Sequence, residues 1–329
     1  MQLELANKDL KDISAILSCS LDLENGKEND FELLISREDW RDEFAFGNYI
    51  YVKDTDFGGR IGEVDTSTAI DTISILGYTW RGLLAKKIIE PPKGSDYKTV
   101  NGELNTVLHQ LISAYYDDIF SVSDKDTGVN VSFQFDRYCT LLDGIEKMLL
   151  SKNYRLNIKY IQKDQGQSGY VELSAEPIID YSNEIELSQD SRLDFSMKKK
   201  QNGVNHLICL GQGELQARQV IHLYVQDDGS ITEYPFYTGI DEITDKYENT
   251  SAKDLEELKK GGIERLKELM NSTKFEMNVV ELSIDVAIGD IIGGRDYLTG
   301  FHLKKPIVSK ILRLENDVAT VEYDIEGDD

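Results

Sequence analysis

The stretch HLICLGQGELQARQVIHLYV, residues 206–225, decides what kind of fold this sequence encodes. In it, Gly211 and Gly213 follow an apolar run, a pattern that opens either a phosphate-binding loop or a turn between strands. A dinucleotide-binding fingerprint needs a third glycine at position 216 and a helix directly after it. Position 216 is glutamine, and no Gly-Lys-Ser/Thr follows to make a P-loop. The sequence therefore argues against nucleotide binding.

The residues after this loop are rich in β-branched side chains, which favours a strand over a helix. We therefore expect Asn205–Leu210 and Gln219–Val225 to be neighbouring strands, with both glycines in their connection. Glycine suits backbone conformations that are closed to other residues. If Gly213 has a positive φ, Gly213→Ala should destabilise the fold by about 1 kcal/mol or more.

Composition limits the classes of partner. The chain has 329 residues and a net charge of −24. Phosphate recognition needs clustered Lys and Arg, so we expect no specific nucleic-acid binding. No apolar run approaches the roughly 18 to 20 residues of a membrane helix, so we expect no membrane insertion. The start, MQLELANKDLKD, lacks the pattern of a signal peptide, which predicts synthesis in the cytoplasm.

Cysteine and histidine do not indicate a metal centre. The cysteines Cys19, Cys139 and Cys209 are widely spaced and odd in number, and each is expected to be a small core residue. His206 and His222 could face each other across the hairpin, but two ligands do not make a zinc site. We therefore expect no metal and no cofactor.

No catalytic constellation is evident. The chain lacks a G-x-S-x-G elbow and an H-E-x-x-H helix. Neighbouring acids such as Asp227 and Asp228 are better explained by turn chemistry than by paired-carboxylate catalysis. We expect no catalytic residue and no enzyme activity.

Residues 1–92 are expected to form a first β-barrel-like part. FELLIS, NYIYVKD and DTISILGYTW have strand composition, and turn signals separate them at Asn25-Gly26 and Gly58-Gly59. WRGLLAKKII is a short candidate helix in which Trp80 is expected to be a core residue. Pro91-Pro92 closes this part, because proline cannot continue a regular element.

Residues 93–183 are expected to form an inserted small α+β domain. In GELNTVLHQLISAYYDD, apolar residues recur at three- and four-residue steps, which predicts an amphipathic helix. A second helix is predicted from about Arg137. YRLNIKYI and GYVELSAE alternate between apolar and polar residues as strands do, and the polar QKDQGQSG joins them.

Residues 184–329 are expected to form a second β-barrel-like part with a helix near 251–270. Ser251 and Asp254 have the spacing of a capping box. Gly261-Gly262 should cost roughly 2 kcal/mol against alanine and predicts a break in that helix. PIVSKILRLENDVATVEYDI predicts a hairpin that turns at 315–317. The predicted class is thus β-rich α+β.

Three groups of motifs resemble the tail-hub, or baseplate-hub, proteins of long-tailed phages, prophages and related injection machines. The first is GNYIYVKDTDFGGRIGEV followed by LGYTWRGLLAKKIIEPP. The second is GVNHLICLGQGELQARQVI. The third is YENTSAKDLEELKKGG followed by DVAIGDIIGGRDYLTG. The structural motif residues of the resemblance are Gly58, Gly59, Trp80, Asn205, Gly211, Gly213, Arg218, Gly289 and Asp290.

The resemblance implies a structural protein of the virion tail, made in the bacterial host cytoplasm. It implies a homotrimer whose β-barrel-like parts form a ring that adapts a sixfold tail tube to a threefold tip and lets DNA pass. Expected partners are a distal tail or tail-tube protein, a tape-measure protein, and tip or receptor-binding proteins. Some relatives carry hydrolase domains at the C-terminus, and none is expected here, where the sequence ends at Asp329.

One alternative of a different class stays open. The chain could be a receptor- or carbohydrate-binding tail protein, including one that hydrolyses cell walls. Aromatic-lined grooves with converging acids would favour that alternative, whereas ring-forming barrel edges favour the hub. The acidic balance has two explanations: an acidic channel that repels DNA, or a surface that keeps the protein soluble.

Overall fold

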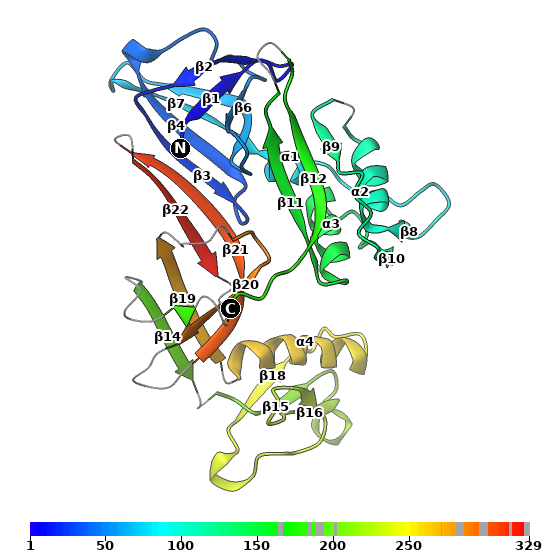
Figure 1. The fold of residues 1–329 in the computed structure, drawn as a ribbon. Helices are drawn as coiled ribbons and strands as arrows, with labels where there is room; N and C mark the ends of the chain where they lie inside the picture. The colour runs from blue at the N-terminus through cyan, green and yellow to red at the C-terminus, as the bar shows by residue number, and fades with distance from the viewer. Residues whose placement is uncertain are drawn as a thin grey trace. The chain divides into compact units, whose positions relative to one another are not determined.

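The protein is described here from a computed structural model (Figure 1). The structure describes residues 1–116, 118–163, 167–182, 186–187, 194–200, 203–270, 272–280, 286–295, 302–315 and 318–325. Strands hold 43% of the chain and helices 18%, and the main sheet is a curled half-barrel. The predicted β-rich α+β class is therefore confirmed.

The chain divides into two compact units. The first unit comprises residues 1–194 and 277–326, and the second comprises residues 195–276 with 327–329. The second unit lies wholly within the part that the sequence assigns to residues 184–329. The finer division at 92/93 and 183/184 stays a prediction.

The large sheet of the first unit is antiparallel and runs in the order β19-β22-β21-β3-β4-β7-β6-β5-β1-β2. Strands near both ends of the sequence share it, because β21 pairs with β3. The two outer parts predicted from the sequence thus contribute to one sheet. Its strands are β1 (Leu3–Ala6), β2 (Asp12–Ile16), β3 (Cys19–Asn25), β4 (Asp30–Ser36), β5 (Tyr49–Val52), β6 (Gly58–Thr66), β7 (Thr72–Thr79), β19 (Ser272–Val280), β21 (His302–Glu315) and β22 (Val318–Ile325).

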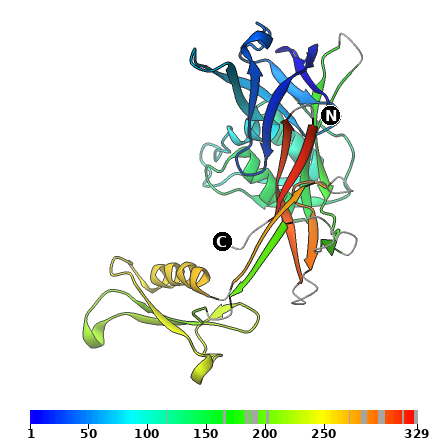
Figure 2. The ribbon, with the colours of Figure 1, turned by 90° about the vertical axis from the view of Figure 1, so that its left-hand side faces the viewer.

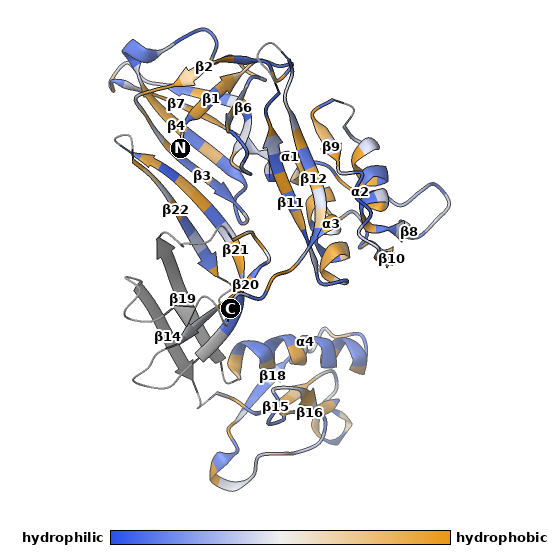
Figure 3. Cartoon of the chain, in the orientation of Figure 1, coloured by the Kyte–Doolittle hydropathy of each residue, from blue (hydrophilic) through white to orange (hydrophobic). Residues whose placement is uncertain are grey.

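Strict alternation along these strands explains the core of the sheet. In β3, Leu21 and Leu23 are buried while Asp22 between them is exposed. In β4, Phe31 and Leu33 are buried on either side of the exposed Glu32. Successive side chains of a strand point to opposite faces, so one face is apolar and the other polar. Hydropathy therefore alternates along these strands (Figure 3).

Gly58 and Gly59 lie in β6 and not in a turn, so the predicted turn signal was wrong at this position. Both residues pair with β5, Gly58 with Tyr51 and Gly59 with Ile50. The physical reason is close packing: a Cβ on Gly59 would lie 2.3 Å from the carbonyl oxygen of Tyr78. Here glycine marks a close backbone approach within a strand.

The α+β module of the first unit follows the short 3-10 turn η1 (Arg37–Asp39), the first seven strands and helix α1 (Trp80–Ala85). Helices α2 and α3 lie beside the β11–β12 hairpin (Figure 1). Strand β9 adds to β12 in parallel, and β10 pairs with β8. The elements are β8 (Thr99–Glu103), α2 (Leu104–Ser113), β9 (Phe120–Val122), β10 (Asn130–Gln134), α3 (Leu141–Leu150), β11 (Tyr154–Ile161) and β12 (Tyr170–Pro177).

Helix α3 begins at Leu141, four residues later than the sequence pattern predicts from Arg137. Tyr138 has a φ of 57°, in the left-handed region, which no right-handed helix contains. Thr140 then caps the helix, since its side chain accepts a hydrogen bond from the Asp143 N–H. Apolar periodicity therefore starts before the helix itself does.

The predicted C-terminal hairpin is confirmed by the pairing of β21 with β22, in which Glu315 lies opposite Val318. Its turn residues 316 and 317 lie outside the described residues. β20 (Ile291–Arg295) pairs with β21 and, in parallel, with the short β13 (Glu186–Leu187).

The second unit begins within β14 (Asp194–Lys200), at residue 195. Its sheet has the order β17-β16-β15-β18, and α4 packs on one face of it (Figure 2). The predicted hairpin is confirmed: β15 (His206–Leu210) pairs with β16 (Val220–Val225), and a 3-10 turn, η3 (Leu215–Ala217), lies in the connection. The other elements are β17 (Ile231–Thr232), η4 (Gly239–Asp241), β18 (Thr244–Glu248) and α4 (Leu255–Leu269).

Helix α4 differs from its prediction at the start and in the middle. It begins at Leu255, and its N-cap is Asp254, whose side chain accepts from the Glu257 N–H at 2.8 Å. The capping box expected at Ser251 does not start the helix. The helix also continues through Gly261-Gly262 without a break. A Cβ on Gly262 would lie 2.4 Å from Cys209 Sγ, so glycine lets the helix approach the sheet.

Gly213→Ala should destabilise the protein by about 1 kcal/mol or more. Gly213 has a φ of +94°, and a Cβ there would lie 2.4 Å from the carbonyl oxygen of Ala217. Gly229→Ala is the matched control, because Gly229 has a φ of +81° but no atom within 4 Å of a Cβ. Urea unfolding should show the larger loss for Gly213→Ala; equal losses would mean that the Ala217 contact contributes nothing.

Glu103→Gln should destabilise the protein at neutral pH by an amount that fades in acid. Burial acts to raise the pKa of Glu103, but hydrogen bonds from the Thr127 hydroxyl and from the N–H groups of Thr106 and Thr127 outweigh it and lower this pKa to about 2. A depressed folded-state pKa stabilises the fold above the ordinary value of 4.5, and this contribution is lost as pH falls toward 2.

The measurement is chemical unfolding of both proteins at several pH values. The difference in unfolding free energy should be largest above about pH 5 and shrink progressively below it. The exposed Glu264→Gln is the control and should change stability by less than about 0.5 kcal/mol. A Glu103→Gln deficit that is constant down to about pH 3 would contradict the capping account.

Candidate functional site

The polar face of the large sheet carries a row of acidic side chains from three strands, β3, β4 and β6. Asp22 of β3 lies directly opposite Glu32 of β4, Glu32 lies opposite Leu76 of β7, and Leu76 lies opposite Glu63 of β6. Asp30 lies beside this row and, with the three acids, lines a groove of about 520 Å³. The face is therefore strongly anionic.

Like charges directly opposite each other destabilise a sheet, so this row needs local compensation. Arg313 of β21 supplies part of it, because its Nε lies 3.0 Å from an Asp22 carboxylate oxygen. The Ser74 hydroxyl donates to Glu32 at 2.8 Å. Burial, together with the nearby carboxylates of Glu28, Glu24 and Asp22, raises the pKa of Asp30.

A second constellation joins the large sheet to the α+β module around Trp80, the first residue of α1. Trp80 is fully buried. Its ring lies 5.7 Å from that of Tyr49 and 6.0 Å from that of Tyr160, between centroids. Gly58 makes room for the indole, since a Cβ there would lie 2.7 Å from Trp80 Nε1. The structure thus brings together Gly58 and Trp80, which lie far apart in the sequence.

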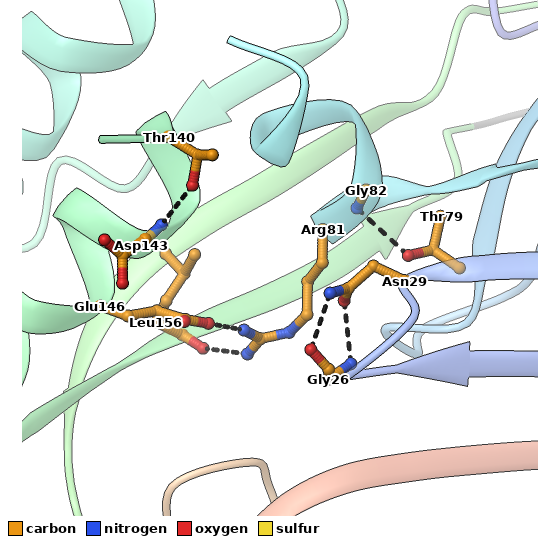
Figure 4. Close-up of polar contacts among 9 residues, drawn as sticks. All are labelled: Gly26, Asn29, Thr79, Arg81, Gly82, Thr140, Asp143, Glu146 and Leu156. Carbon is orange, nitrogen blue, oxygen red and sulfur yellow. Dashed lines mark hydrogen bonds and ion pairs between the residues drawn. The ribbon is translucent and has the colours of Figure 1, made fainter. Parts of the chain in front are cut away.

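The residue after Trp80 ties the same helix to the module by polar contacts (Figure 4). The Arg81 side chain is 6% exposed, and its guanidinium forms an ion pair with Glu146 of α3. Arg81 also donates to the Leu156 carbonyl of β11 at 3.1 Å. Because Thr79 caps α1 through the Gly82 N–H, the start of this helix is fixed where Trp80 and Arg81 need it.

Gly289 and Asp290 lie in a third constellation within the first unit. Asp290 is 1% exposed. One carboxylate oxygen accepts from Arg155 Nε at 2.8 Å and from the Ile179 N–H at 3.0 Å, and the other accepts from the Ala287 N–H at 3.0 Å. A buried carboxylate with this many partners is satisfied, and removing it would leave a buried guanidinium without its counter-charge.

The remaining motif residues lie in the second unit, around the 206–225 hairpin. Asn205 donates through its side chain to the Asp241 carbonyl at 2.7 Å and accepts from the Ile243 N–H at 2.9 Å. Arg218 forms an ion pair with Glu248 of β18. Gly211 and Gly213 lie in the connection, where Gly211 packs close to Gln219 and Leu258. Their placement fits a structural role, which stays a prediction.

Sequence reasoning missed three of these features: the acidic row, Arg81 and the Arg155–Asp290 pair. The alternation in SLDLEN and DFELLIS places Asp22 and Glu32 on the polar faces of their strands. This alternation could have indicated the acidic row. No sequence pattern pairs Arg155 with Asp290, since they are separated by 135 residues.

Neither a metal centre nor a membrane helix is found among the described residues. No group of three or more His, Cys, Asp or Glu side chains there could hold a metal ion. Of the helices in the described ranges, none is long and apolar enough to cross a membrane.

The fold matches solved structures of tail proteins. A prophage MuSo2 43 kDa tail protein from Shewanella oneidensis superposes with a TM-score of 0.53 at 12% sequence identity, over 99% of this chain and 98% of that one. A chain of the p2 virion baseplate in its activated conformation superposes with a TM-score of 0.50 at 8% identity, over 99% and 98%. The fold implied by the resemblance is therefore confirmed.

Two other comparisons found nothing. No protein-family model matches the sequence. No curated protein matches it either.

Gly58→Ala should destabilise the protein by about 1–3 kcal/mol, because a methyl group there overpacks the Trp80 ring. Gly62→Ala is the matched control in the same strand, since a Cβ at Gly62 meets no atom within 4 Å. Thermal unfolding measures both. A loss at Gly62 as large as that at Gly58 would assign the effect to the strand backbone and not to the indole.

Proposed function

We propose that this chain is the structural hub of a phage-type tail tip. In this proposal it forms a homotrimeric ring that adapts a sixfold tail tube to a threefold tip and lets DNA pass. The observation that carries the proposal is the match of the fold to a prophage tail protein over nearly the full length of both chains. The partners proposed are a distal tail or tail-tube protein, a tape-measure protein, and tip or receptor-binding proteins. The proposed location is the virion tail.

A strand with one open edge supports the ring. Among the described strands, β2 ends the large sheet and pairs only with β1. An exposed edge presents unpaired backbone groups that need cover. A closed ring of identical copies covers every such edge in the same way.

The acidic row supports a channel through which duplex DNA slides. Duplex DNA carries one negative charge per roughly 1.7 Å of its axis, so basic walls would retain it. A wall lined by Asp22, Asp30, Glu32 and Glu63 would repel it and leave it mobile. We propose that this face of the large sheet lines the channel. The row also places like charges opposite each other, a cost that a merely soluble surface does not require.

No catalytic step is assigned to the chain in this proposal. The acidic groove of about 520 Å³ is lined mainly by acids and by the sheet residues Phe31, Leu76, Gly77 and Tyr78. Glu32 and Glu63 stand on separate strands with Leu76 between them. No serine, cysteine or histidine is among the described residues that line this groove, and in this proposal its acids supply charge.

Charge reversal tests the channel. In the triple variant Asp30→Lys, Glu32→Lys, Glu63→Lys, assembled rings should bind duplex DNA roughly tenfold or more tightly at about 50 mM salt, and this gain should fall steeply with added salt. The matched control reverses the exposed acids Asp227, Glu256 and Glu264 of the second unit, with the same change in net charge.

Native mass spectrometry of each protein provides the first readout, and a trimer is expected. A dimer with a large twofold interface would contradict the ring. Equal gains in DNA binding for the two triple variants would contradict the channel face but not the trimer. DNA retention by the unaltered ring would contradict the repulsive channel.

A further inference from the structure

Three side chains on the sheet face opposite α4 form a hydrogen-bonded chain in the second unit. His206 Nδ1 lies 2.7 Å from Glu242 Oε1, and His206 Nε2 lies 2.8 Å from His222 Nδ1. His206 is 8% exposed. Its ring stacks on Tyr224 with centroids 4.3 Å apart, which fixes its orientation.

These three hydrogen-bonded side chains anchor the loop between β17 and β18. Residues 233–243 connect β17 to β18, and they expose Tyr234, Phe236 and Ile240, which are 78%, 48% and 96% exposed. Asn205 binds the backbone of this loop at Asp241 and Ile243. The contact of His206 with Glu242 is the side-chain anchor between these two backbone contacts.

Hydrogen-bond chemistry determines which nitrogen of each histidine carries a hydrogen. An ionised carboxylate only accepts, so His206 Nδ1 carries the hydrogen that is donated to Glu242. Neutral His206 therefore presents a lone pair at Nε2, and His222 Nδ1 must donate to it. The Nε2 atom of His222 is left as the acceptor at the outer end.

Both hydrogen bonds, from His206 to Glu242 and between His206 and His222, persist when one proton is added. It binds at the outer nitrogen of His222, and transfer along the His222–His206 bond makes His206 the cation. The contact with Glu242 then becomes an ion pair as well as a hydrogen bond. Charge-assisted bonds of this kind are roughly twice as strong as neutral ones.

A second added proton breaks the hydrogen bond between His206 and His222. Both imidazoles then carry hydrogen on both nitrogens, so His206 Nε2 and His222 Nδ1 are two donors facing each other at 2.8 Å. Two like charges at this distance repel. His222 is exposed and can move away, whereas His206 stays beside Glu242.

The strand register gives the positions of the other charged groups on this face of the sheet. On β18, Thr244 lies opposite His206, Lys246 opposite Ile208, and Glu248 opposite Leu210. Glu248 is paired with Arg218. Thr244 Oγ1 lies 3.2 Å from His206 Nδ1. On β16, Tyr224 lies opposite His206, and on β17 the uncharged Thr232 lies opposite Tyr224. Glu242 is the acid bonded to the pair.

We propose that Glu242, His206 and His222 form a proton-operated latch on the loop 233–243. The first proton tightens the hold on the loop through Glu242. The second proton breaks the His206–His222 bond and releases His222 from the sheet. The latch controls how firmly an apolar, aromatic loop is presented, and it does not depend on the proposed ring.

Hydrogen–deuterium exchange of the full-length protein between about pH 5 and 8 tests the latch, with rates corrected for intrinsic exchange. Peptides covering 239–243 should exchange roughly five- to tenfold more slowly near pH 6 than near pH 8. Toward pH 5, peptides covering 220–225 should exchange faster as the histidine pair separates.

Three variants show which side chain causes each change in exchange rate. Glu242→Gln keeps an acceptor for His206 but removes the charge, so the slowing at 239–243 should disappear. His222→Gln keeps a partner for His206 but cannot take a second proton, so only the acceleration at 220–225 should disappear. His109→Gln, on α2 in the first unit, should retain both effects.

The wild-type profile alone can overturn the proposal. Exchange of 239–243 that does not change with pH would exclude the latch, whatever the variants do. Equal slowing in Glu242→Gln would show that the Glu242 charge plays no part in it. Loss of both effects in His109→Gln would assign them to the first unit.

Discussion

The structure of the first unit depends on the packing of one indole ring, that of Trp80. The ring fills the space between the large sheet and the α+β module and contacts Tyr49 on one side and Tyr160 on the other. Gly58 must lack a side chain for this to happen. Arg81, the next residue, uses the same helix start to reach the module with a buried guanidinium. The fit also leaves Trp80 Nε1 buried without a partner among the described residues, at a cost of about 1–3 kcal/mol. The apolar burial of the ring offsets this.

The large sheet divides its two faces between stability and charge. The buried face carries Leu, Ile and Phe side chains and supplies the apolar area that holds the unit together. The polar face carries acids in adjacent positions, where repulsion is only partly relieved by Arg313 and Ser74. A sheet that accepts such repulsion must be stabilised from its other face. Four of the sixty Asp and Glu residues of the chain thus lie together on this face, and their position gives the channel proposal its physical content.

The second unit uses glycine and polar anchors where the first uses aromatic packing. Gly262 lets α4 approach Cys209, and Gly213 takes a backbone conformation that other residues reach only with strain. His206 on the opposite face, together with Asn205 just before β15, holds the loop that leads to β18. One face of this small sheet is thus closed by a helix, and the other is organised by side chains that can exchange protons.

The sequence by itself determined the local structure and the fold class. Alternation in β3, β4, β11 and β12, periodicity in α2 and α3, and the hairpin around Gly211 and Gly213 follow from side-chain period and turn chemistry, which act over a few residues. The sequence pattern predicted the starts of α3 and α4 too early and assigned Gly58 to a turn. Helix caps and close backbone contacts depend on neighbouring residues that the pattern does not show. Only the tertiary structure decided that β21 pairs with β3, that Arg155 meets Asp290, and that acids from three strands form one row. These contacts join residues far apart in the chain, and register between distant strands is set by the packing of a whole sheet and not by any local sequence.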